Sequence, residues 1–439
     1  MGTLFWICLL YWVAIFSVAG FVALILYLAG YFVLFLLGLE LFCKRASFPI
    51  WFVAPPLWVV LEHLRAVGEL GFPWGQLGSS LTYHPLLLQM SDITGPYGVS
   101  LWIVLVNALI YHALISFRGR AKFLSALMLV ILLPLAYGLF CYQRKDLLEG
   151  DPLTLSLVQP NIDQDQKWSP VYRDTTFQIL EALSRDTLLD RPDLIVWPET
   201  AVPAFIRHHG VYRRRVSRMA ESFGVPLLVG SQDFDRIGER DYLTYNSAFL
   251  FHEDGLMDDR RYSKIRLVPF GEKLPYEDLF PALRRIEYQG GHFSAGDEFT
   301  LFDVDQGNFG VLICFESIFP DLSREFCRRG ANFLLNITND AWFLRTSAPY
   351  QHASALAMRA IENRVWIGRS GNTGITMIVD PLGRIVARTP IFTQAVLSGG
   401  IRARTPDSFY LRHGDFVAYG SWGLVGLAAI AHRRTRRYR

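Results

Sequence analysis

The 439-residue chain has few cysteines and little excess charge. Its five cysteines form no CxxC pair and no Cys/His spacing of the kind that binds zinc, which excludes a zinc site built on such motifs. Charged residues make up 19% of the chain and the formal net charge is +3, which is too small to favour nucleic-acid binding. No internal repeat is present, and no pattern predicts a metal ion or another cofactor.

Charge is missing altogether from residues 4–39. As one helix these residues would measure roughly 54 Å at about 1.5 Å per residue, whereas the hydrocarbon core of a membrane is about 30 Å thick. We therefore expect a break near residues 17–20, which leaves a partial first segment and a full second one. A signal peptide is the alternative reading, but the run is too long and no basic residues precede it.

Further apolar runs predict more membrane crossings. Residues 97–117 and 123–142 are each long enough to cross. The run 48–61 is weaker because Pro55 and Pro56 interrupt it, and the run 416–431 is short for a crossing. We count about six crossings in all.

Lysines and arginines give the orientation of these crossings. Three basic clusters, at 44–45, 118–122 and 433–439, alternate with connections that are poor in cations. The positive-inside rule places such clusters on the cytoplasmic side. The region 144–415 then lies on the far side of the membrane.

Residues 151–405 alternate short apolar or β-branched runs with helical stretches. This alternation predicts an α/β domain in which helices cover a sheet. The expected strands are 153–158, 194–197, 226–229, 246–251, 310–314, 333–337 and 375–379, and the expected helices include 172–189, 212–223 and 351–364.

Three motifs in this region carry chemistry: WPET with Glu199, YSKIRLVPFGE with Lys264, and ICFES with Cys314. A thiolate can attack a carbonyl, a carboxylate can take the thiol proton, and an ammonium can stabilise the oxyanion that develops. Each residue alone has an ordinary alternative: a buried cysteine, a surface lysine, or a glutamate at a helix start. Their occurrence together favours acyl-transfer chemistry.

These motifs occur with GFPWGQLG at 71–78, VQPNIDQDQKW at 158–168, NDAWF at 339–343 and GNTGIT at 371–376. As a set they resemble the carbon-nitrogen hydrolase (nitrilase) superfamily, and with the membrane flanks the chain resembles the bacterial apolipoprotein N-acyltransferases. The resemblance implies an α/β fold, a nitrilase-like αββα sandwich domain inserted between transmembrane α-helices. It also implies eight membrane helices, of which the first one or two are absent or truncated here. The implied domains are a helix bundle at 1–143, an extracytoplasmic catalytic domain at 144–415, and a closing helix with a basic cytoplasmic tail at 416–439.

The resemblance also implies roles for single residues. Glu199 is the expected general base, Lys264 the oxyanion stabiliser and Cys314 the nucleophile. Glu272 and Glu316 match acidic positions that support this triad, although Glu316 has the alternative of pairing with a nearby arginine.

Aromatic residues complete the expected site. Trp168 and Trp342 match positions near the substrate entrance, with the alternatives of core packing or an interface anchor. Phe315 stands where a tyrosine is common after the nucleophile, and it keeps the ring without the hydroxyl. Aromatic residues around Trp342 and within 276–293 are expected to cover the site and exclude water.

The implied function is acyl transfer from a membrane phospholipid to the amino group of diacylglyceryl-cysteine at a lipoprotein N-terminus, through a cysteine thioester. The expected partners are the phospholipid, the lipoprotein and the membrane, without nucleic acid. The expected location is the bacterial inner membrane, with the catalytic domain on the periplasmic side. One alternative is a membrane-tethered amidase or nitrilase acting on a small amide or nitrile, and another is a non-enzymatic binding protein with a degenerate domain.

Overall fold

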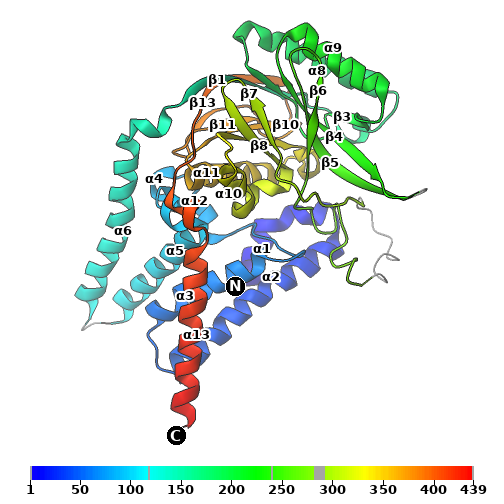
Figure 1. Ribbon diagram of the computed structural model, residues 1–439. Helices are drawn as coiled ribbons and strands as arrows, with labels where there is room; N and C mark the ends of the chain where they lie inside the picture. Colours follow the sequence, from blue (N-terminus) through cyan, green and yellow to red (C-terminus); the bar gives the residue numbers. More distant parts are fainter. Residues whose placement is uncertain (1, 117–118, 239–240, 281–291, 438–439) are drawn as a thin grey trace. The chain divides into compact units, whose positions relative to one another are not determined.

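The computed structural model describes residues 2–116, 119–238, 241–280 and 292–437, and the chain forms two compact units (Figure 1). One unit contains Met1–Arg144 and Ser408–Arg439, and we call it the helical unit. The other contains Lys145–Asp407, and we call it the sandwich unit. In sequence, the sandwich unit therefore interrupts the helical unit.

The helical unit is built from helices throughout. A predicted break within the first apolar run is confirmed, because Ser17 caps the second helix by accepting a hydrogen bond from the backbone N–H of Gly20 at 3.0 Å. The helices are α1 (Gly2–Leu10), a 3₁₀ turn (Tyr11–Ile15), α2 (Val18–Leu39) continued by a wider turn (Glu40–Arg45), α3 (Ile50–Ala66), a 3₁₀ turn (Leu77–Leu81), α4 (Pro85–Leu88), α5 (Ser91–Ile115), α6 (Arg120–Gln143), α12 (Phe409–His413) and α13 (Phe416–Arg437).

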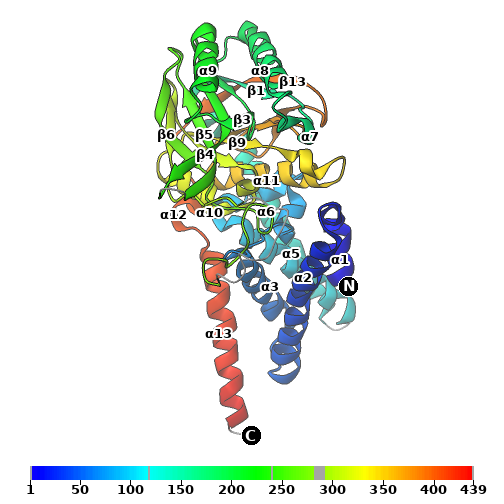
Figure 2. The same ribbon diagram turned by 90° about the vertical axis from the view of Figure 1, so that its right-hand side faces the viewer.

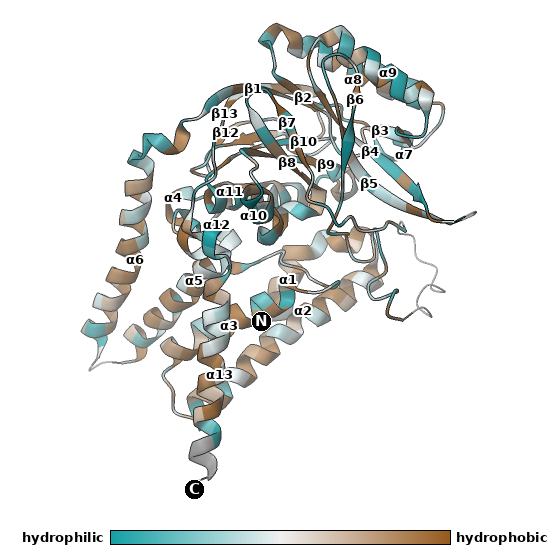
Figure 3. Ribbon diagram, in the orientation of Figure 1, coloured by the Kyte–Doolittle hydropathy of each residue, from teal (hydrophilic) through white to brown (hydrophobic). Residues whose placement is uncertain are grey.

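Three helical segments among the described residues are long and apolar enough to cross a membrane: Val18–Arg45, Ser91–Ile115 and Arg120–Gln143. Figure 3 shows the hydrophobic colour prevailing along α2, α5 and α6. We expected about six crossings, whereas three helical segments among the described residues are both long and apolar enough. The apolar stretch Gly2–Ile15 is short, α3 has 17 residues, and the last turns of α13 carry basic residues.

The expected interruption at Pro55 and Pro56 was wrong, because α3 runs through both prolines. Each proline lacks the N–H that would bond to the preceding turn, and this loss normally breaks or kinks a helix. Here Val53 and Leu57, on either side of the prolines, are buried in a cluster with Phe42 and Ala428. This packing favours the continuous helix over a break.

The sandwich unit contains two sheets. The first has the order β13-β1-β2-β4-β5-β6, with β3 paired to β4, and the second has the order β12-β11-β10-β9-β8-β7. The first sheet is formed by β1 (Asp151–Gln159), β2 (Leu194–Val196), β3 (Val202–Phe205), β4 (Leu227–Arg236), β5 (Tyr242–Phe251), β6 (Met257–Ser263) and β13 (Ala395–Ala403). The second is formed by β7 (Leu301–Val304), β8 (Gly307–Ile313), β9 (Phe333–Thr338), β10 (Trp366–Gly371), β11 (Met377–Val379) and β12 (Ile385–Arg388).

Helices cover the outer face of each sheet (Figures 1 and 2). Phe177 from α8 (Arg173–Thr187) and Val216 from α9 (Gly210–Phe223) are buried in one core with strand residues of the first sheet. The second sheet is covered by α10 (Pro320–Arg328) and α11 (Ala348–Asn363). The two sheets face each other, and Ser370 of β10 donates a hydrogen bond to the carbonyl of Val158 in β1 at 2.8 Å. The predicted αββα fold is confirmed.

Strand ends bring the motifs to one region of this sandwich. In the first sheet β1, β2 and β4 run parallel, and in the second β8, β9 and β10 run parallel. The WPET motif follows β2, the lysine motif spans the end of β6, and the cysteine motif follows β8. A short helix, α7 (Gln164–Lys167), lies in the connection after β1.

Candidate active site

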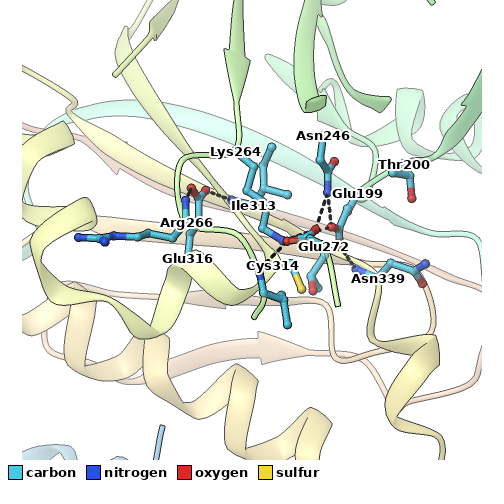
Figure 4. A network of polar contacts seen from close by, with 12 residues as sticks. Glu199, Thr200, Asn246, Lys264, Arg266, Glu272, Ile313, Cys314, Glu316 and Asn339 are labelled. Carbon is cyan, nitrogen blue, oxygen red and sulfur yellow. Dashed lines mark hydrogen bonds and ion pairs between the residues drawn. The ribbon is translucent and has the colours of Figure 1, made fainter. Parts of the chain in front are cut away.

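The structure brings together the side chains of Glu199, Lys264, Cys314 and Glu272 (Figure 4). The Nζ atom of Lys264 lies 3.8 Å from Oε1 of Glu199 and 2.8 Å from Oε1 of Glu272. The charges of Glu199 and Lys264 both act on the thiol of Cys314. A carboxylate, an ammonium and a thiol thus share one site, as the motifs predicted, with a second carboxylate beside the ammonium.

Two hydrogen bonds fix the carboxylate of Glu199, which is 6% exposed. Its Oε1 accepts from the side-chain amide of Asn246 at 2.7 Å, and its Oε2 accepts from the backbone N–H of Asn339 at 2.7 Å. The next residue, Thr200, has a φ of 47°, a conformation that is unfavourable for a β-branched residue. Glu199 therefore sits in a tight turn and is aimed by contacts from β5 and from the end of β9.

Lys264 is almost fully buried, with 1% of its surface exposed. Burial disfavours its charged form, but the carboxylates of Glu272 and Glu199 and the nearby Cys314 outweigh burial and raise the pKa of Lys264 above its ordinary value. Glu272 is itself held, because its Oε2 accepts from the backbone N–H of Val268 at 2.8 Å. Lys264 is thus a fixed positive charge at neutral pH.

Cys314 opens a 3₁₀ helix, Cys314–Ile318, directly after β8. Its φ is 53°, in the left-handed region that residues with a side chain seldom adopt. Its carbonyl accepts hydrogen bonds from Ser317 Oγ at 3.0 Å and from His352 Nε2 at 3.0 Å. A sharp strand-to-helix turn of this kind presents a nucleophile at the end of a strand, and Cys314 is partly exposed there.

The surroundings of Cys314 favour the protonated form of its thiol. Burial and the negative charge of Glu199 raise the pKa of the thiol, and the opposing effect of Lys264 is too small to cancel them. A thiol in this state must lose its proton before it can act as a nucleophile. Glu199 is a carboxylate whose negative charge acts on this thiol.

Glu316 does not join the four side chains but lies behind them, and it is fully buried. Its carboxylate accepts from the backbone N–H groups of Ile313, Ile265 and Arg266 at 2.7 to 3.0 Å, and from the hydroxyl of Tyr262 at 2.8 Å. These bonds connect the residue before Cys314 to the two residues after Lys264. Burial raises the pKa of Glu316 to about 7, against the pull of these donors and of the Lys264 charge.

A second polar cluster, which the motifs did not reveal, supports the nucleophile. The buried ring of His352 places Nδ1 2.9 Å from Asp340 Oδ1, while its Nε2 donates to the carbonyl of Cys314. Asp340 is also paired with Arg369 at 2.7 Å. Burial alone would raise the pKa of Asp340, but Arg369 and His352 outweigh it and hold the pKa well below its usual range. Asp340 lies inside the motif NDAWF, and this position is the feature of the sequence that could have indicated the cluster.

Three further polar residues were also missed as parts of the site. Asn246 lies in β5 and Asn339 follows β9, and both bond to Glu199. Lys167, in α7, donates to the carbonyl of Glu199 at 3.1 Å and to Oγ1 of Thr200 at 2.6 Å. Asn339 and Lys167 lie within quoted motifs, whereas nothing in the sequence around Asn246 marks it.

The expected aromatic residues differ in exposure. Trp168 is 40% exposed and Trp342 is 54% exposed, whereas Phe315 is only 6% exposed and packs against Phe319 with ring centroids 5.1 Å apart. Of the expected cover at 276–293, residues 281–291 lie outside the described residues.

No metal site accompanies this chemistry within the described ranges, where no group of three or more His, Cys, Asp or Glu side chains is arranged to hold an ion. All five cysteines are free thiols.

Comparison with known proteins agrees with this geometry. Residues 154–406 match the family model of the carbon-nitrogen hydrolases, and residues 1–109 match that of the apolipoprotein N-acyltransferase N-terminal domain. An amidase from Nesterenkonia sp. of solved structure aligns with 62% of this chain and 97% of its own chain, at 18% sequence identity and a TM-score of 0.46. The match to the family model over residues 154–406 shows that the sandwich unit is a carbon-nitrogen hydrolase domain.

Similarity to whole proteins is more specific. The chain is 42% identical over 390 residues to the apolipoprotein N-acyltransferase of Geobacter metallireducens, covering 87% of this chain and 74% of that protein. It is 32% identical over 455 residues to the apolipoprotein N-acyltransferase of Chlorobaculum tepidum, covering 97% of this chain and 85% of that protein. The chain belongs to the apolipoprotein N-acyltransferase family, which confirms the resemblance drawn from the motifs.

Proposed function

We propose that this protein transfers an acyl chain from a membrane phospholipid to the N-terminal amino group of diacylglyceryl-cysteine in lipoproteins. Glu199 is the general base, Lys264 the oxyanion stabiliser and Cys314 the nucleophile. The observation that carries the proposal is that the partly exposed Cys314 lies beside the carboxylate of Glu199 and the ammonium of Lys264 (Figure 4). Membership of the family supports the choice of substrates.

In the first step Cys314 Sγ attacks the ester carbonyl of the phospholipid while Glu199 takes the thiol proton. The Lys264 ammonium stabilises the negative charge on the carbonyl oxygen. When this intermediate collapses, the bond to the glycerol oxygen breaks, and Glu199 returns its proton to that oxygen. The products are a lysophospholipid and an acyl thioester on Cys314.

In the second step the amino group of the lipoprotein, in its neutral form, attacks the thioester and gives one proton to Glu199. The carbon–sulfur bond then breaks, an amide forms, and Glu199 passes the proton to the thiolate of Cys314. An amide is more stable than a thioester, so the second step is strongly downhill. Glu272 supports the first and second steps by holding Lys264, and Glu316 supports them by holding the backbone on both sides of the site.

Exposed apolar side chains around the site support a lipid substrate. Trp168 follows Lys167, Trp342 lies three residues after Asn339, and Phe270, which is 59% exposed, lies two residues before Glu272. Each of these exposed rings therefore lies within three residues of a residue that bonds to Glu199 or Lys264. These exposed rings offer apolar surface that an acyl chain can contact. We propose that Trp168 and Trp342 contact acyl chains, and that the nearly buried Phe315 forms the wall beside the nucleophile.

The location proposed for this reaction is the bacterial inner membrane, with the sandwich unit on the periplasmic side. The basic clusters at 44–45, 118–122 and 433–439 support a cytoplasmic side for the helix ends that carry them. A membrane-impermeant thiol reagent should label a cysteine introduced at Asp235, but not one introduced at Arg436, in cells with a permeabilised outer barrier. The reverse labelling would overturn the orientation.

Mass spectrometry after exposure to phospholipid alone tests the proposed chemistry. The wild-type protein should release about one lysophospholipid per molecule and carry the acyl mass on the Cys314 peptide, since no acceptor amine is present. A diacylglyceryl-cysteine peptide should restart turnover, and the same peptide with an acetylated amino group should not. Steady phospholipid hydrolysis without acceptor would make the protein a hydrolase. Absence of any acyl adduct, with turnover of small amides, would make it a membrane-tethered amidase.

A further inference from the structure

Lys167 is a buried amine that the proposed mechanism does not use. Only 1% of its surface is exposed, and its Nζ atom donates to two acceptors on consecutive residues, the carbonyl of Glu199 and the hydroxyl of Thr200. The positive φ of Thr200 makes this turn an unfavourable one that neighbouring contacts must hold. Lys167 therefore bonds to the backbone carbonyl of Glu199 and to the side chain of Thr200, and not to the carboxylate of Glu199.

The helix that carries Lys167 is itself fixed to the site. Asp163 caps α7 by accepting from the backbone N–H of Asp165 at 2.9 Å, and Gln164 accepts from the side-chain amide of Asn339 at 2.7 Å. The backbone N–H of Asn339 in turn bonds to the Glu199 carboxylate. Lys167 and Asn339 thus approach the same residue from two sides, one holding its backbone and the other its carboxylate.

We propose that Lys167 is a positioning residue, which clamps the Glu199–Thr200 turn so that the Glu199 carboxylate faces the thiol of Cys314. It does not touch the reacting atoms and acts only through Glu199. The inference rests on the proposed role of Glu199 as the base, but not on the identity of the lipid substrates.

The lowered pKa of Lys167 favours a role through hydrogen bonds over a role through its positive charge. Burial outweighs the attraction of Glu199 and lowers the pKa of Lys167 to about 7, and Glu199 is the one ionisable group whose charge counters this shift. A neutral amine still has two N–H groups, enough for the two acceptors. Both bonds therefore survive loss of the proton, and the clamp holds on either side of neutral pH.

The test measures how fast iodoacetamide alkylates Cys314 in the detergent-solubilised full chain, read on the Cys314 peptide because four other thiols are free. Four proteins are compared: wild type, Lys167→Met, Glu199→Gln and the double variant. Lys167→Met keeps most of the side-chain volume but loses both bonds. It should slow alkylation about tenfold to a hundredfold, because a misplacement of about 1 Å can cost a hundredfold.

The double variant decides between a positioning role and a merely structural one. If Lys167 acts through Glu199, Lys167→Met should slow alkylation by less than about twofold in the Glu199→Gln background, since neighbouring residues of one unit are not additive. A full additional loss in that background would overturn the proposal. Lys145→Met, which changes an exposed lysine, is the matched control and should match wild type.

A second pair of variants keeps the test decisive if Lys167→Met does not fold. Thr200→Val removes one acceptor of the clamp with almost no change of shape, and it should slow alkylation about threefold, a typical loss for one hydrogen bond. Thr200→Ser keeps the oxygen and should restore the wild-type rate. Equal rates for the two variants would contradict the clamp.

Lysophospholipid release separates this inference from the proposed function. If the clamp and the proposed function are both correct, Lys167→Met should lower the rate of the lysophospholipid burst at saturating phospholipid. The phospholipid concentration that gives half of the maximal rate should stay unchanged. If wild type releases no lysophospholipid while the alkylation results stand, the proposed substrates fail and the clamp remains. If lysophospholipid is released but Lys167→Met alkylates at the wild-type rate, the clamp fails and the proposed function remains.

Discussion

Two turns of the backbone carry the chemistry of this site, and they are held in different ways. Glu199 precedes Thr200, whose φ is 47°, and Cys314 has a φ of 53°. The Glu199 turn is held by the uncharged bonds of Asn246 and Asn339 and by the amine of Lys167. The Cys314 turn is held by His352 and Glu316, and His352 contacts the buried ion pair of Asp340 and Arg369.

The difference follows from what each turn must do. In the proposed mechanism the carboxylate of Glu199 accepts and returns a proton, and its ion pair with Lys264 is long, at 3.8 Å, so that it does not hold the carboxylate strongly in one state. The backbone at Cys314 keeps the same conformation through both steps, so buried ion pairs such as Asp340 with Arg369 can fix it rigidly. Substitutions on the nucleophile side, around Cys314, should therefore lower the stability of the fold. Substitutions on the base side, at the Glu199–Thr200 turn, should lower the reaction rate.

Lys264 is the cation between the two turns, and its removal should have the largest effect. Lys264→Met should lower acyl transfer about a thousandfold or more, because a buried oxyanion donor is lost and the Glu199 and Glu272 carboxylates come to face each other without a cation. The measurement is the burst of lysophospholipid, with melting in detergent as a check on folding. A folded variant with more than about a tenth of the wild-type rate would exclude the oxyanion role.

Glu316 should make the nucleophile side sensitive to pH. Its pKa rises from 4.5 to about 7, so the folded protein keeps a proton that the unfolded chain has lost between these values. The group's contribution is therefore lost as pH rises from about 4.5 to about 7, by about 3 kcal/mol at about 1.36 kcal/mol per pH unit.

The check is thermal melting of wild type and Glu316→Gln across that range, since glutamine cannot titrate. The melting temperature of wild type should fall relative to that of the variant as pH rises. Tyr262 and Lys264 face the same carboxyl and titrate far above this range, so they do not interfere. Parallel melting curves would show that Glu316 does not titrate there.

A substitution at Gly230 would displace the Glu199–Thr200 turn by a steric effect alone. A Cβ atom at this position in β4 would lie 2.8 Å from the Cα of Glu199 and 2.8 Å from the backbone N of Thr200. Gly230→Ala should therefore shift the turn and lower the rate of Cys314 alkylation about thirtyfold, with a loss of about 1 to 3 kcal/mol in stability. Gly400→Ala in β13 of the same sheet is the control, because a Cβ there meets no atom within 4 Å. Equal rates for the two variants would mean that the turn tolerates displacement.

From the sequence we expected Glu199, Lys264 and Cys314 to come together because each lies in a short motif, and Glu199 and Cys314 each follow an apolar run. The sequence predicted neither Asn246 nor the position of His352, because these residues reach the site only after β5, β9 and α11 have assembled from distant parts of the chain. The hydrophobic pattern also did not predict β6, which reads MDDRRYS, or β13, which includes two glycines. Their pairing with β5 and β1 decides their conformation, and such pairing is not encoded locally.

His352 offers the smallest and most selective change on the nucleophile side. Its Nε2 donates to the carbonyl of Cys314 and its Nδ1 lies against Asp340. In a glutamine the side-chain amide can reach the position of Nε2, whereas the shorter asparagine reaches only that of Nδ1. His352→Gln should therefore keep the bond to Cys314, and alkylation of Cys314 should stay within about threefold of wild type. His352→Asn should lose this bond and slow alkylation about tenfold, the rate equivalent of one buried hydrogen bond. A slower His352→Gln than His352→Asn would mean that the contact with Asp340, and not the bond to the Cys314 carbonyl, holds the nucleophile in place.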